Sequence, residues 1–273
     1  MITILAATDF SPIADNAVEY AAAFAKQFDA RLVLFNAFEL PMHVANSFIS
    51  ASGFQDLLNE NETRLKEKAL LIASTYDIDV AYETKFSFVG EELEVLMDKY
   101  NANLIVLGMA ARTLEQDLLG NTTTAAIRNL KFPVLAVPMG AKFEGMKKML
   151  FACDVLKGVS ADVLSRIKRL AAELKAEIEV FHVDEKIETL KARDSDLSAP
   201  GVINDGLAGI TYSYKNVQSG SVIREIKKEI IASKTELLIM VPEEHGFWAS
   251  LVHKSKTRMM AAGLEIPLLS IPL

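Results

Sequence analysis

The stretch Ile4-Leu5-Ala6-Ala7-Thr8-Asp9, an apolar run that ends in an aspartate, decides the fold because it occurs twice in the chain. Met149-Leu150-Phe151-Ala152-Cys153-Asp154 has the same form 145 residues later. Three further matches follow in the same order: residues 30–36 with 176–182, Gly90 with Gly220, and residues 132–138 with 266–272. Ordered matches of this kind indicate two copies of one domain, and we predict domains over 1–140 and 146–273.

The spacing between matching residues also locates a deletion in the second copy. It falls from 146 between Ala30 and Ala176 to 130 between Gly90 and Gly220, so the second copy lacks 16 residues between these points. In the first copy this region includes residues 57–76, where apolar residues recur at helical spacing. In the second copy residues 194–201 resemble a loop. We therefore predict a shortened or missing helix there.

Short apolar runs alternate with longer amphipathic stretches in each copy, which indicates parallel strands joined by helices. The run Leu104-Ile105-Val106-Leu107 is apolar on both faces, as is typical of a buried parallel strand. The fold class predicted is α/β, with two doubly wound domains, each with a five-stranded parallel sheet in the order 3-2-1-4-5. For the first copy we predict strands over about 2–8, 31–37, 79–86, 104–108 and 133–137, with helices over about 13–27, 57–76, 89–100 and 120–130.

Composition narrows the classes of function. Residues 1–140 contain 10 Lys and Arg against 18 Asp and Glu, a net charge of −8, and residues 141–273 contain 19 against 18, a net charge of +1. Neither half is basic enough to predict nucleic-acid binding. No stretch approaches the roughly 20 apolar residues of a membrane helix, and no signal peptide is expected. The single cysteine cannot form an intrachain disulfide. A cytoplasmic protein is expected.

A ligand site is expected at the carboxyl ends of the strands, where the strand order reverses between the first and fourth strands. Thr8 and Asp9 end the first strand, Gly108 ends the fourth, and residues 120–124 begin the next helix, whose free N–H groups suit an anion. Each element has a simpler structural interpretation. Asp9 can be a turn or cap residue with no role in binding, and Gly108 can be a turn at the strand end with no role in binding. The residues beside the site include no lysine.

These residues resemble the universal stress protein family. Residues 7–17 resemble its opening strand, turn and helix, residues 132–138 resemble its last strand, and the two copies together resemble its tandem members. The resemblance implies adenine-nucleotide binding in some members, pairing through the last strand, and a role in stress tolerance. It therefore predicts that residues 134–137 and 268–271 pair the two halves as an intrachain pseudo-dimer, with a further homodimer as a second expectation.

The family's ATP-binding members have a loop with a glycine, two residues, a second glycine, nine residues, then a glycine followed by Ser or Thr. Here the second glycine is replaced by Ala111, Gly120 follows only eight residues later, and Asn121 takes the Ser/Thr place unless Thr122 substitutes for it. A Cβ at Ala111 obstructs the approach of the backbone to phosphate. By similarity the predicted nucleotide-binding residues are Thr8, Asp9, Ala37, Gly108, Ala111, Gly120, Asn121 and Thr122.

The second copy departs further from this motif, because residues 241–245 replace the glycine loop. His182 is interpreted as a buried histidine at a strand end, and Cys153 as a small apolar residue in a strand. The four histidines show no spacing typical of a metal site. We therefore predict neither a metal nor a catalytic residue.

Three functions remain open for such a protein. The first is a non-enzymatic, stress-response regulatory protein with weak adenine-nucleotide binding, ATP or a relative, in the first domain. The second is a nucleotide-independent protein that binds a protein partner or another small ligand, for which the apolar pair Phe247-Trp248 is a candidate surface. The third is a slow ATPase. For this function the sequence offers neither a general base nor a set of metal-binding carboxylates beside the phosphate site.

Overall fold

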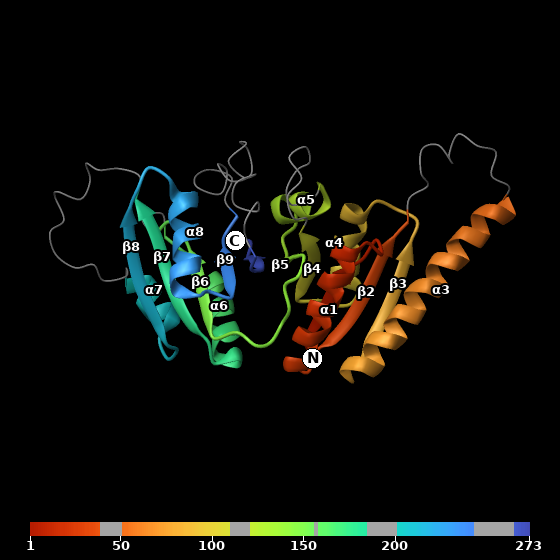
Figure 1. Cartoon of the computed structure of the whole chain (residues 1–273), viewed down its shortest axis with the longest axis horizontal. Coiled ribbons are helices and arrows are strands. Elements are labelled where there is room, and N and C mark those ends of the chain that lie inside the picture. Colours follow the sequence, from red (N-terminus) through yellow and green to blue (C-terminus); the bar gives the residue numbers. More distant parts are fainter. Residues whose placement is uncertain (39–50, 110–120, 156–157, 185–200, 243–264) are drawn as a thin grey trace. The chain divides into compact units, whose positions relative to one another are not determined.

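The computed structural model of the 273-residue chain describes residues 1–38, 51–109, 121–155, 158–184, 201–242 and 265–273. The chain folds as two compact units. The first comprises Met1–Ala110 and Leu119–Phe143, and the second includes Glu144–Leu273. In Figure 1 the first unit runs from red to yellow-green and the second from green to blue.

The first unit is a parallel sheet with the strand order β3-β2-β1-β4-β5, which confirms the predicted order 3-2-1-4-5. Helix α3 begins about six residues before the predicted start at residue 57. Its elements are β1 (Thr3–Ala7), α1 (Pro12–Gln27), β2 (Arg31–Ala37), α3 (Ala51–Tyr76), β3 (Val80–Lys85), α4 (Val89–Lys99), β4 (Leu104–Met109), α5 (Asn121–Asn129) and β5 (Val134–Pro138).

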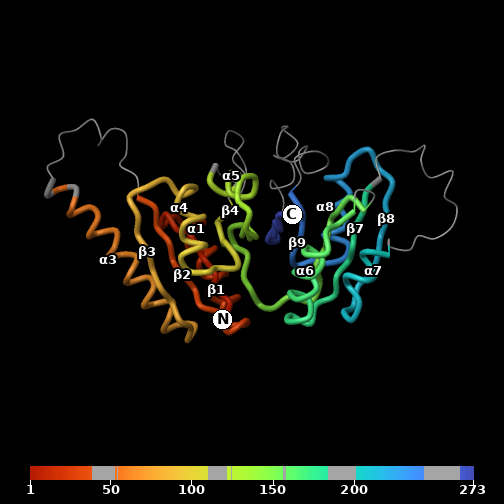
Figure 2. Tube along the Cα trace, turned by 180° about the vertical axis from the view of Figure 1, so that it is seen from behind, coloured from red at the N-terminus to blue at the C-terminus, as the bar shows by residue number. Residues whose placement is uncertain are grey.

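Helices cover both faces of this sheet. Helix α1 contacts β1 and β4 and lies beside α3, whereas α4 contacts α5 on the other face. Figure 2 shows α3 running beside β3 along the length of the strand. Because both faces are covered, the central strands are buried: Ile4, Leu5 and Ala6 of β1 and Ile105 and Val106 of β4 are all 0% exposed.

Helix α1 begins where the sequence places its start signals. The hydroxyl of Ser11 accepts a hydrogen bond from the N–H of Ala14, and Pro12 occupies the first turn, where its missing N–H costs no hydrogen bond. Five of the eight buried residues of the helix are alanines, including Ala17, Ala21 and Ala25. The small size of these side chains lets α1 approach the sheet closely, which matters for the site below.

The second unit repeats this arrangement in shortened form. Its order is β10-β9-β6-β7-β8, the same topology with β6 in the place of β1. Helix α7 has 7 residues where α3 has 26, which confirms the predicted shortening. The elements are β6 (Lys148–Ala152), α6 (Ala161–Leu174), β7 (Glu177–Asp184), α7 (Gly201–Leu207), β8 (Tyr212–Gln218), α8 (Val222–Ser233), β9 (Leu237–Met240) and β10 (Leu268–Ser270).

Candidate functional site

The turn after β1 holds two of the predicted site residues. The hydroxyl of Thr8 is buried and accepts the N–H of Phe10 at 3.0 Å, and the carboxylate oxygen Oδ1 of Asp9 accepts the N–H of Ser11 at 2.9 Å. Phe10 has a φ of +61°, a conformation that these two hydrogen bonds help to hold. The turn function proposed for Asp9 is therefore present, while its carboxylate is exposed to solvent.

The end of β2 lies directly beside this turn. The side-chain amide of Asn36 donates to the carbonyl of Thr8 at 2.8 Å, and the N–H of Thr8 donates to the carbonyl of Phe35 at 2.8 Å. Ala37, the last residue of β2, is half-buried. Because Asn36 holds the backbone of Thr8, three of the predicted nucleotide-binding residues, Thr8, Asp9 and Ala37, lie at one edge of the sheet.

Gly108 at the end of β4 has a role in packing that the sequence did not reveal. It lies within the strand and not in a turn, so the strand-end-turn interpretation is wrong. A Cβ on Gly108 would lie 2.7 Å from Cγ2 of Ile13 and 3.0 Å from the carbonyl oxygen of Ile13, in the first turn of α1. Glycine is therefore required here for the close approach of helix and strand.

Helix α5 is tied to the same edge. The hydroxyl of Thr123, which is 4% exposed, donates to the carbonyl of Gly108 at 2.9 Å. Asn121 is the first residue of α5, and Thr122 next to it is exposed. The structure thus brings Asn121, Thr122 and Gly108 to the carboxyl ends of the strands. Ala111 and Gly120 lie outside the described residues, so nucleotide binding by this set stays a prediction.

Two cations from α3 lie near the β1 turn, although they are more than 50 residues away in the sequence. The guanidinium of Arg64 lies 4.1 Å from the centre of the Phe10 ring, and Lys68 pairs with Asp15 at 2.9 Å. Sequence reasoning found no lysine beside the site, since a contact between α3 and the β1 turn has no local signal. Two of the 10 Lys and Arg of residues 1–140 therefore lie close to this turn.

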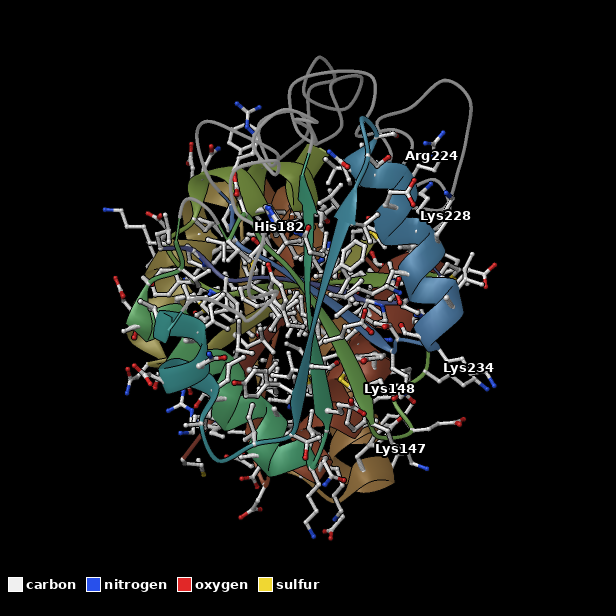
Figure 3. The ribbon with its side chains drawn as sticks, turned by 90° about the vertical axis from the view of Figure 1, so that its left-hand side faces the viewer. Lys147, Lys148, His182, Arg224, Lys228 and Lys234 are labelled. Atoms are coloured by element: carbon white, nitrogen blue, oxygen red, sulfur yellow. The ribbon has the colours of Figure 1, made fainter. Side chains whose placement is uncertain are left out.

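The second unit carries a different polar group at the equivalent place. His182, where the first unit has Asn36, is 4% exposed, and its Nδ1 lies 3.2 Å from the carbonyl oxygen of Cys153 and 3.9 Å from Oδ1 of Asp154. Figure 3 shows His182 toward one end of the sheet, with Lys147 and Lys148 at the other, where β6 begins. Residues 243–264, including Phe247-Trp248, lie outside the described residues.

The opposite edge of the first unit has a hollow of about 270 Å³. Its lining includes Asp29, Arg31, Asp77 and Asp79, at the amino ends of β2 and β3. Arg31 pairs there with Asp79 at 3.1 Å. The hollow is thus far along the strands from the carboxyl edge that the sequence predicts as the ligand site.

Two further expectations from the sequence concern metal ions and membrane helices. Among the residues that the structure describes, no group of three or more His, Cys, Asp or Glu side chains is placed to hold a metal ion. None of the described helices combines the length and the apolar composition that crossing a membrane requires.

Comparison with known proteins identifies relatives of this arrangement. Residues 1–138 match the sequence model of the Universal stress protein family, and no curated protein gives a significant match. A universal stress protein of Archaeoglobus fulgidus superposes with a TM-score of 0.74 at 16% identity, over 99% of this chain and 98% of its own. A functionally unknown protein of Pseudomonas aeruginosa PAO1 gives 0.60 at 15% identity, over 99% and 92%. At these identities the structural likeness shows a shared fold.

Proposed function

The chain belongs to the universal stress protein family, as its residues predicted, and we propose that it is a non-enzymatic regulatory protein of the stress response. We further propose that its first unit binds an adenine nucleotide weakly. One observation carries this proposal: the exposed carboxylate of Asp9 stands at the carboxyl end of β1, next to β4, and Gly108 of β4 bonds to Thr123 near the start of α5. In a doubly wound sheet this is the position where ligands bind.

The phosphate side of the proposed site is the start of α5. The first N–H groups of a helix have no partner within the helix and attract anions. The bond from Thr123 to the carbonyl of Gly108 fixes this helix start against β4. The excess of acidic residues in the first half opposes a polyphosphate, so we expect an affinity in the high micromolar to millimolar range, about 4–6 kcal/mol.

A regulatory role is favoured over a catalytic one because the polar groups of the site already serve the structure. The hydroxyl of Thr8 holds Phe10, the hydroxyl of Thr123 holds Gly108, and one oxygen of Asp9 holds Ser11. A general base must be able to reach and release a proton. The second oxygen of Asp9 remains able to contact a ligand, and its natural use is to accept hydrogen bonds.

Calorimetry of the full chain with ATP, ADP and AMP at millimolar concentration tests the proposal. Two variants of Asp9 separate its functions. Asp9→Asn keeps an oxygen that can accept a hydrogen bond from the N–H of Ser11 but removes the negative charge. Asp9→Ala removes both the oxygen and the charge. We expect both variants to weaken binding about tenfold, with the melting temperature lowered only by Ala. Absence of binding at 5–10 times the highest expected dissociation constant, roughly 10 mM, would refute nucleotide binding.

A nucleotide-independent interaction protein is the second candidate, and exposed aromatic residues favour it. Phe86 and Phe88, between β3 and α4, are 52% and 62% exposed, and Val95 of α4 is 57% exposed. Large exposed apolar side chains that gather in one region mark interaction surfaces. A photo-crosslinking residue at position 88 is expected to capture a partner in cells, whereas one at Glu94, a polar exposed position of α4, is not. Equal yields from both positions count against this candidate.

Self-association and location stay predictions from the sequence. Light scattering of the full chain measures whether a homodimer forms in solution. Fractionation of cells that express the natural chain tests the expected cytoplasmic location.

A further inference from the structure

In each unit an ion pair joins the third strand to the helix that follows it, and the two pairs have opposite polarity. In the first unit, Nζ of Lys99 in α4 lies 2.9 Å from both carboxylate oxygens of Glu83 in β3. In the second unit the strand carries the lysine, and Nζ of Lys215 in β8 donates to Oε2 of Glu229 in α8. The pairs occupy matching places. Each strand residue is the register partner of the same repeat position on the neighbouring strand, and each helix residue lies nine positions after the glycine matched in the repeat.

The pair of the first unit is surrounded by additional hydrogen-bond donors. The hydroxyl of Tyr100 donates to Oε2 of Glu83 at 2.8 Å, and Nζ of Lys85 lies 3.3 Å from Oε1. Burial acts to raise the pKa of Glu83, but the hydrogen bonds from Lys99, Tyr100 and Lys85 together lower it. One carboxylate with three donors is thus held in its ionised form.

The second unit has fewer donors at this place and one more acid. Val217 and Ile230 stand where the first unit has the additional lysine and the tyrosine. Glu179 of β7 adds a second carboxyl group where the first unit has Val33, which is 0% exposed. Oε1 of Glu179 is buried and has no hydrogen-bond partner among the residues that the structure describes. Two carboxyl groups therefore share the ammonium group of Lys215.

The contact between these two carboxyl groups requires a proton. Helix α8 packs on β6 and β7, and its residue Glu229, which is 7% exposed, lies within hydrogen-bonding distance of Glu179. Ionised carboxylates only accept hydrogen bonds, so two of them cannot bond to each other unless one holds a proton. The other charged groups that face Glu179 are Lys215 of β8 and Lys148 of β6, and both favour its ionised form. Burial and the charge of Glu229 outweigh these lysines and raise the pKa of Glu179.

We propose that Glu179, Glu229 and Lys215 form a proton-binding cluster that holds α8 on its sheet more firmly at low pH than at high pH. With the proton in place, Glu179 donates to Glu229, which also accepts from Lys215. Loss of the proton leaves two like charges between β7 and α8, and docking of the helix weakens as the pH rises. The side chain of Lys215 is 47% exposed, so the cluster can exchange protons with solvent.

The first unit should respond in the opposite sense. Because the docked state of α4 stabilises Glu83 as a carboxylate, its contribution is lost only when strong acid protonates Glu83. The cluster of the second unit involves no residue of the proposed nucleotide site, so its pH response is separate from nucleotide binding.

Hydrogen exchange of the full chain without nucleotide, from about pH 5 to pH 8, tests the proposal. The observed rates are divided by the intrinsic rates at each pH, which gives protection factors that depend only on structure. The protection of α8 should fall about three- to tenfold across this range, whereas that of α4 should stay constant. Protection of α8 that does not fall, or that falls no more than that of α4, would overturn the proposal.

Variants of Glu179 identify the group that titrates. Glu179→Gln keeps a donor for Glu229 but cannot ionise, and Glu179→Val installs the residue of the first unit. Both should make the protection of α8 independent of pH. Glu177→Gln is the matched control, since it removes a carboxyl group from the same face of β7, and the fall should persist in it.

The variants also exclude the other titratable group on this strand. His182 lies on the opposite face of β7 and is present in every variant. A fall in protection that both Glu179 variants retain therefore belongs to another group and refutes the cluster. If neither variant folds, the comparison of α8 with α4 in the natural chain decides.

Discussion

Replacing Gly108 by alanine puts a Cβ 2.7 Å from Cγ2 of Ile13 and 3.0 Å from its carbonyl oxygen. Carbon atoms in contact prefer about 3.5–4.0 Å, so either the Ile13 rotamer or the first turn of α1 must move. Overpacking of this kind costs about 1–3 kcal/mol. We expect the Gly108→Ala variant to lose that much stability in the first unit while the second unit is unaffected.

Hydrogen exchange of the full chain measures this loss locally, because each unit gives its own peptides. Amides of β1 and β4 in the Gly108→Ala variant should exchange about 5- to 150-fold faster. Gly90→Ala is the matched control: Gly90 lies in α4 with nothing within 4 Å of an added Cβ, so the helix should gain about 0.4–1 kcal/mol.

A double-mutant cycle identifies the cause. Ile13→Ala removes Cγ2, the nearest atom to the new Cβ, so the two substitutions together should destabilise less than the sum of their separate effects, by about 0.5–3 kcal/mol. Strictly additive effects, or exchange in Gly108→Ala as slow as in Gly90→Ala, would show that the close approach of α1 does not require this glycine.

Two further predictions concern a cap and a carboxyl group. Ser11→Ala removes the hydroxyl that caps α1 and should cost about 1 kcal/mol by urea unfolding, whereas Ser221→Ala at α8, where the hydroxyl makes no cap bond, should be close to neutral. Burial, with the nearby carboxylate of Glu229, raises the pKa of Glu179. A raised pKa in the folded state makes a carboxyl group favour folding at low pH and oppose it as the pH rises through that pKa. Glu179→Gln should therefore stabilise the chain increasingly from pH 4 to pH 7, and Glu177→Gln on the same strand should not; parallel pH profiles of the two variants would contradict the assignment.

The strand order and the shortened helix followed from the sequence because both rest on local patterns. Apolar runs of strand length recur in a fixed order, and the change of offset between Ala30 and Gly90 is a matter of counting. The start of α3 was placed too late, since residues 51–56 include a glycine and polar residues that give little helical periodicity.

The site was harder to predict because its key contacts join distant segments. The sequence identified Thr8, Asp9 and Gly108 as neighbours through the topology of the sheet. It could not show that Gly108 is pressed against Ile13, or that α3 carries Arg64 to the ring of Phe10. These contacts depend on the distance between a helix and a sheet, and no spacing in the sequence encodes that distance.

The two copies place different groups beside the turn that follows their first strand. In the first unit the long helix α3 brings Arg64 to the ring of Phe10 in that turn, and it brings Lys68 to Asp15 in the first turn of α1. Helix α7 of the second unit has 7 residues, none of which is Lys or Arg, and the bond between Tyr212 and Asn204 anchors it at the start of β8. Nδ1 of His182 lies 3.9 Å from Oδ1 of Asp154, at the place where the first unit has Asn36. Replacing His182 by asparagine should therefore affect the turn at Asp154 more than a surface substitution in α7 does.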